Sequence, residues 1–192
     1  MKTAKERAND WKSRQRKRGA ILLIFPALAA ICILLLNACG KPAAPPAPPE
    51  AFTATAKIQA GQVQMEAALQ QERPGALRAA FSAPAELAGM VLELSGATAR
   101  LTYGETEREW PAEALPETGF LRLLQQALLQ AQANAATENN TAAQRTEGGL
   151  WQLSGESGGY RYTAQLAEDG RLLRMEAPEL ALTVVLEYQA NA

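Results

Sequence analysis

Apolar residues recur at every second position through most of residues 51–192, and this alternation constrains the fold more than any other feature of the chain. A period of two places alternate side chains on opposite faces of a β-strand. Turn signals such as Arg73-Pro74-Gly75 and Glu168-Asp169-Gly170 separate the alternating stretches. Strands joined by tight turns pair with their neighbours in sequence, so the pattern predicts an antiparallel meander of about ten strands with one buried face.

One segment breaks this period. Over about 117–135, apolar residues recur at spacings of three and four, which predicts one long amphipathic helix. The polar stretch 136–147 that follows is predicted to be a loop. A single helix cannot cover both faces of so large a sheet. We therefore predict an α+β, mostly β fold: a strongly curved antiparallel sheet, or half-open barrel, with the helix packed on its concave face.

The N-terminal part has a different composition. Residues 1–18 hold eight of the 19 Lys and Arg residues and two of the 20 acidic residues, giving a net charge of +6. Residues 19–36 are then apolar or small and carry no charge. A basic head before an apolar run is typical of an export signal, and the positive head stays on the cytoplasmic side.

The sequence Leu36-Asn37-Ala38-Cys39 resembles the lipobox of bacterial lipoproteins, in which the cysteine sulfur receives a diacylglycerol. The resemblance implies a signal peptide at 1–38, lipid attachment at Cys39 and a protein held on the outer face of the bacterial cytoplasmic membrane. Residues 39–50 are predicted to be the lipidated cysteine and an extended Pro/Ala-rich linker, followed by one domain at 51–192. An uncleaved signal anchor is the alternative, since eighteen apolar residues can span a bilayer.

Charge and composition exclude several classes of function. Eleven basic and eighteen acidic residues remain after position 18, and a net charge of −7 offers no field for nucleic acid. The chain contains no histidine, so Ser-His and Cys-His catalytic arrangements cannot form. Both cysteines lie at or before position 39. We expect no enzyme activity, no cofactor and no metal, and we interpret Glu105, Glu107 and Glu109 as outer-face charges that discourage edge pairing rather than as an acid–base or cation site.

Several short motifs in 51–192 resemble a family. Their residues are Pro84, Leu87, Gly89 and Met90 in the first motif, then Trp110-Pro111, Leu115-Pro116, and Met175-Glu176-Ala177-Pro178. With the predicted curved sheet and lipid anchor, they are similar to the LolA/LolB-like group of lipoprotein carriers and RseB-like sensors, and most closely to uncharacterised Firmicutes or clostridial lipoproteins. The resemblance implies a fold that can hold acyl chains. Unlike the soluble carriers of that group, this chain keeps a predicted anchor.

Function could depend on the apolar set between the predicted sheet and helix. Its members are Met65, Leu69, Leu77, Phe81, Met90, Leu92, Leu101, Trp110, Phe120, Leu124 and Leu128. They could form a solid core, or they could line a cavity for an acyl chain if the sheet curves without closing. We therefore expect a non-catalytic module that binds lipid or lipoprotein acyl chains, or else a regulatory lipoprotein that binds another envelope protein.

Overall fold

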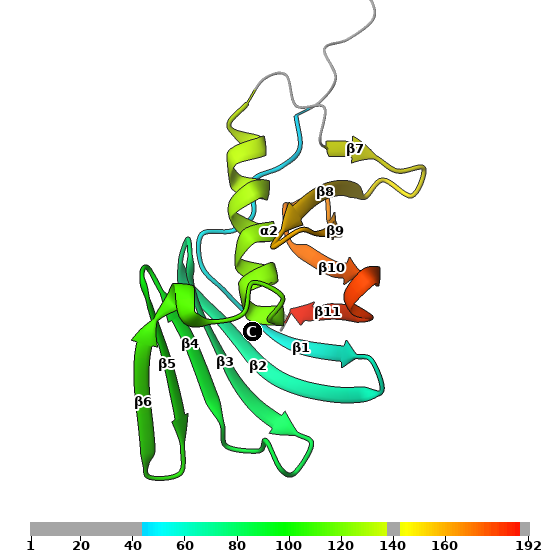
Figure 1. The fold of residues 1–192 in the computed structure, drawn as a ribbon. Coiled ribbons are helices and arrows are strands. Elements are labelled where there is room, and N and C mark those ends of the chain that lie inside the picture. The colour runs from blue at the N-terminus through cyan, green and yellow to red at the C-terminus, as the bar shows by residue number, and fades with distance from the viewer. Residues whose placement is uncertain (1–43, 138–142, 189–192) are drawn as a thin grey trace, which may run out of the picture. The chain divides into compact units, whose positions relative to one another are not determined.

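The computed structural model describes residues 44–137 and 143–188, which form one antiparallel sheet of eleven strands and one α-helix, α2 (Phe120–Ala135) (Figure 1). The strands are β1 (Phe52–Ala60), β2 (Val63–Arg73), β3 (Ala76–Ala83), β4 (Val91–Ser95), β5 (Thr98–Tyr103), β6 (Thr106–Pro111), β7 (Ala143–Arg145), β8 (Trp151–Ser157), β9 (Tyr160–Leu166), β10 (Leu172–Ala177) and β11 (Leu182–Tyr188). The predicted fold, a mostly β protein with an open sheet and one helix, is confirmed.

The sheet consists of two meanders joined side by side. Its strand order is β6-β5-β4-β3-β2-β1-β11-β10-β9-β8-β7, with β1 paired to β11. Strands β6 and β7 are the two edges, so the sheet does not close. In sequence, the segment that connects β6 to β7 includes the short helix η1 (Ala112–Ala114) and α2. The helix is thus the connection that crosses from one half of the sheet to the other (Figure 1).

Alternation gives the sheet an inner apolar face and an outer charged face. On β1, for example, Ala54, Ala56 and Ile58 are buried, whereas Lys57 between them is exposed and pairs with Glu187 at 2.5 Å. The inner face is the one that packs against α2. The period-two pattern in the sequence therefore identified the buried side of the strands.

Helix α2 buries one side against the inner face. Its principal contacts are with β3, β8 and β10. The buried side chains are Leu121, Leu123, Leu124, Gln125, Ala127, Leu128 and Ala131. Three hydrogen bonds link it to the sheet: Gln125 Nε2 donates to the Gly75 carbonyl at 2.6 Å, the Tyr162 hydroxyl donates to Gln130 Oε1 at 2.5 Å, and Gln130 Nε2 donates to the Ser154 carbonyl at 3.2 Å. Burial also raises the pKa of Tyr162 to about 12, so this hydroxyl keeps its proton.

Two local predictions differ from the structure. The segment predicted to be a loop at 136–147 contains β7, a three-residue edge strand on β8 that is too short to show a period. The last strand begins at Leu182 rather than Leu180. Pro178 starts the short helix η2 (Pro178–Leu180) instead, and Ala181 follows in the left-handed region at φ 48°.

The compact unit begins at Ala44, so the second half of the predicted linker lies against the sheet. Residues 44–49 form neither helix nor strand, and Pro45 and Pro48 are buried. Gln71 Nε2 donates to the Pro49 carbonyl at 3.2 Å and to the Glu50 carbonyl at 3.0 Å. No helix in the described ranges is long and apolar enough to cross a membrane, and both the apolar run 19–36 and Cys39 lie outside those ranges.

The packing of residues 44–50 predicts unequal effects for two glycine substitutions. Gly159 and Gly170 both have positive φ, 80° and 84°, so alanine is strained at either position. A Cβ on Gly170 would lie 2.0 Å from the Ala47 carbonyl oxygen, whereas one on Gly159 would meet no atom within 4 Å. We expect Gly170→Ala to lower the free energy of unfolding by about 1–3 kcal/mol more than Gly159→Ala, measured by urea titration. Equal losses would show that the segment does not pack there.

Candidate functional site

The structure divides the predicted apolar set into a solid core and an open part. Five members are at most 5% exposed and lie between sheet and helix: Leu69, Leu77, Phe81, Leu124 and Leu128. The other six are half-buried, and we call them the apolar shelf: Met65, Met90, Leu92, Leu101, Trp110 and Phe120. The space directly under the helix is therefore filled by side chains, while part of the inner face stays open to solvent.

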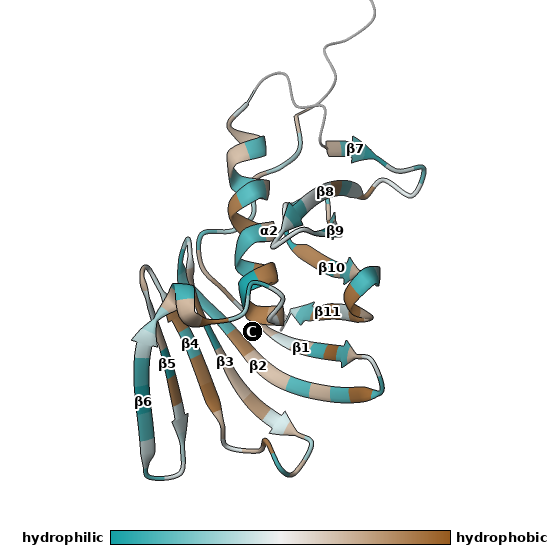
Figure 2. Ribbon diagram, viewed as in Figure 1, coloured by the Kyte–Doolittle hydropathy of each residue, from teal (hydrophilic) through white to brown (hydrophobic). Residues whose placement is uncertain are grey.

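Strand register places the shelf on neighbouring strands of the first meander. Leu92 on β4 lies opposite Leu101 on β5, and Trp110 on β6 lies opposite Ala99. The Phe81 amide donates to the Met90 carbonyl at 2.8 Å, which brings Met90 beside β3. Strands β4 to β6 are not among the principal partners of α2. Figure 2 shows the result: apolar bands recur on β3 to β5, whereas the edge strand β6 is largely hydrophilic.

Phe120 connects the shelf to the solid core. It is the first residue of α2, and its ring meets that of Phe81 edge-on, with the ring centroids 5.8 Å apart. An aromatic pair in this orientation is favourable beyond the area that it buries. On the sheet side, Met65 lies opposite the buried Ile58. The shelf therefore continues from the beginning of the helix onto β2.

Two further apolar residues lie at the rim of the shelf, and the sequence analysis did not include them. Val63 is 51% exposed and lies on the same face of β2 as Met65, while Tyr103 is 49% exposed and shares its face of β5 with Leu101. The Tyr103 hydroxyl donates to the Glu86 carbonyl at 3.4 Å, in the loop between β3 and β4. Both could have been found from the sequence, because each stands two positions from a predicted lining residue.

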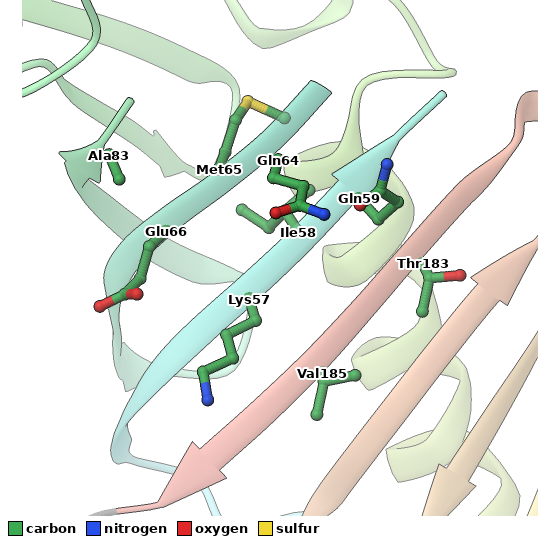
Figure 3. Close-up of a pocket in the computed structure, with 9 residues that line it drawn as sticks. All are labelled: Lys57, Ile58, Gln59, Gln64, Met65, Glu66, Ala83, Thr183 and Val185. Carbon is green, nitrogen blue, oxygen red and sulfur yellow. The ribbon is translucent and has the colours of Figure 1, made fainter. Parts of the chain in front are cut away.

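The outer face has hollows of a different character. One of about 410 Å³ is lined by residues that include Lys57, Gln59, Thr183 and Val185, and Figure 3 shows Lys57, Thr183 and Val185 on the side of the strands away from the helix. Another, of about 560 Å³, lies at β8, β9 and η2 and includes Arg161. Only Met65 of the predicted set lines either hollow. Neither hollow therefore corresponds to the predicted cavity between sheet and helix.

The acidic strand segment lies on the outer face and in a turn. Arg100 Nη2 contacts Glu109 at 3.0 Å, and Arg100 Nε contacts Glu107 at 3.3 Å. The hydrogen bond that Arg100 donates to Glu109, together with the charge of Glu107, raises the pKa of Arg100. Glu105 lies in the turn before β6. Within the described ranges, no three Asp, Glu or Cys side chains gather closely enough to hold a metal ion.

The division between core and shelf predicts different costs for removing a leucine side chain. Leu124 is fully buried on the sheet-facing side of α2, whereas Leu101 is half-buried on the shelf. Leu124→Ala should lower the free energy of unfolding by about 2–5 kcal/mol, because it leaves a cavity. Leu101→Ala should lower the free energy of unfolding by less than about 1.5 kcal/mol, because solvent already reaches this side chain. Urea unfolding of residues 44–192 measures both, and similar losses would contradict an open shelf.

No protein-family model and no curated protein matched this chain. Several solved structures are similar to it, including the following two. The first, an uncharacterized conserved protein from Thermus thermophilus, is 14% identical with a TM-score of 0.43, over 73% of this chain and 81% of that one. The second, a LolA superfamily protein from Nitrosomonas europaea, is 11% identical with a TM-score of 0.36, over 76% and 86%. Scores of this size assign the chain to no family, and the resemblance to the LolA/LolB-like group stays a prediction.

Proposed function

We propose that this protein is a lipid-anchored extracytoplasmic lipoprotein whose apolar shelf binds acyl chains of lipids or lipoproteins without catalysing a reaction. One observation carries the proposal: within the described residues, large apolar side chains of the inner face stay partly exposed on β4 to β6, which are not principal partners of the helix. Contiguous exposed apolar surface on a folded domain marks binding sites for apolar ligands or partners. An acyl chain laid on the shelf would remove that surface from water.

The energetic basis is ordinary hydrophobic burial. Covering apolar surface contributes about 25 cal/mol per Å² of area removed from water. Met65 and Met90 suit this role, because unbranched thioether side chains adapt to flexible, variable ligands. The solid core beneath α2 keeps the sheet rigid, so the chain would bind to a preformed surface rather than open the fold.

The residues argue against chemistry at the shelf. Its six members carry no titratable side chain, and the whole chain contains no histidine to act as a general base. The carboxylates of β6 instead face away from the shelf and pair with Arg100. Binding without catalysis is therefore the function that this surface supports best.

The anchor is the second part of the proposal, and the lipobox-like sequence ending at Cys39 supports it. Diacylglycerol on this sulfur contributes two acyl chains, which suffice for stable attachment to a bilayer. Cys39→Ser should therefore release the protein from the membrane or leave it unprocessed, whereas Cys32→Ser, seven positions earlier, should have no such effect. Membrane fractionation and metabolic labelling with palmitate check this. If Cys39→Ser stays in the membrane fraction as wild type does, and wild type incorporates no palmitate, the result would favour the uncleaved anchor.

A regulatory lipoprotein that binds another envelope protein is the second candidate. The observation that favours it is the pair of open sheet edges, of which β6 presents six residues. An unpaired edge can accept an extended segment of a partner as an additional strand. In that case the partner would contact β6, and the shelf would bind no free lipid.

A matched pair of charged substitutions distinguishes the shelf from the outer face. Leu92 and Val185 are both half-buried, but Leu92 belongs to the shelf and Val185 lines the outer hollow. Leu92→Glu should weaken the uptake of a fluorescent fatty acid at least about tenfold, because a carboxylate would meet the acyl chain. Val185→Glu should leave uptake unchanged. Absence of uptake by the folded wild-type domain would contradict lipid binding and favour the second candidate.

A further inference from the structure

One cation lies on the inner face, at the edge of the apolar shelf. Arg108 on β6 stands directly opposite Leu101 on β5, which itself stands opposite Leu92 on β4. It is also two positions before Trp110, so both side chains belong to the same face of β6. Arg108 therefore ends a cross-strand row whose other members are apolar.

Within the described residues Arg108, like Arg73 and Arg122, has no acidic partner. In the described ranges, the basic residues with an acidic partner are Lys57, Arg78, Arg100, Arg145, Arg161, Arg171 and Arg174. Arg108 is not among them, although glutamates flank it in sequence. Glu107 and Glu109 lie on the opposite face of β6 and pair with Arg100. Alternation thus directs the acids of this strand outward and its one arginine inward.

We infer that Arg108 binds the carboxylate of a long-chain fatty acid whose hydrocarbon chain lies on the apolar shelf. This inference rests on the proposed function and adds the class of ligand to it. A guanidinium group matches a carboxylate through two parallel hydrogen bonds. Arg108 is itself exposed on the edge strand, so a carboxylate can reach it from solvent while the hydrocarbon chain lies on the neighbouring apolar side chains.

The dimensions of the sheet suit such a ligand. Four strand spacings, or about 19 Å, separate β6 from β2. A chain that starts at Arg108 can thus cross Leu101 and Leu92 and extend toward Met90 and Met65. Trp110 flanks the head group on β6. A neutral amphiphile would use the same apolar surface but would leave the arginine without a partner.

The test compares two photoactivatable probes on the full chain in phosphatidylcholine nanodiscs at pH 9. The probes are diazirine-labelled palmitic acid and the corresponding palmityl alcohol, and mass spectrometry maps the crosslinked residues. Wild type should crosslink the acid within the shelf about two- to fivefold more than the alcohol, which is the effect of one exposed charge pair. Arg108→Gln should lose this preference while the alcohol still crosslinks at the shelf. Arg108→Lys should keep part of it, and Arg78→Gln, on the outer face, should keep all of it.

Each other outcome counts against a stated part of the account. Equal crosslinking of acid and alcohol at the shelf in wild type, or the same preference in Arg108→Gln, would overturn the role of Arg108 and leave acyl-chain binding intact. Absence of both probes from the shelf in every variant would instead overturn the proposed function, and the role of Arg108 with it.

Discussion

In the part of the chain that the structure describes, a single α-helix has to cover one face of an open eleven-stranded sheet, and the rest of that structure depends on this constraint. Packing concentrates where α2 meets β3, β8 and β10, and there the leucines are buried almost completely. The inner face of β4 to β6 extends past that contact. Its apolar side chains keep the alternation that a strand requires, but no element within residues 44–137 and 143–188 covers them fully. The shelf is thus the part of the core-facing surface that the helix is too narrow to bury.

The outer face shows that this exposure is specific to one side. A row of opposite charges crosses β3 to β6, with Arg78 and Glu93 3.0 Å apart and Arg100 and Glu109 also 3.0 Å apart. Exposed pairs of this kind contribute little to stability, but they keep the face hydrated and oppose association through it. The outer face of β3 to β6 is therefore less suited to apolar ligands than the inner face of the same strands. The same division leaves Arg108 as the cation of β6 that faces the shelf.

Much of the fold could be predicted from the sequence, because the spacing of apolar residues indicates which side of each strand or helix is buried. The alternation of β1 to β3 and the spacing in α2 were sufficient for the class of fold and the concave packing. Strand β7 was missed, since three residues at an edge carry no period. The separation of core from shelf could not be predicted either, because it depends on where α2 crosses the sheet. Leu92 and Leu77 look alike in sequence and differ only in what lies above them.

The central claim, that acyl chains bind to the shelf, is tested most directly by NMR of methionine methyl groups in residues 44–192. This part of the chain contains three methionines: Met65 and Met90 belong to the shelf, and Met175 is a fully buried internal control. On titration with palmitate, the account predicts that the Met65 and Met90 signals shift together in a saturable way while the Met175 signal stays in place. Unchanged shelf signals, or a shift of Met175 alone, would contradict it.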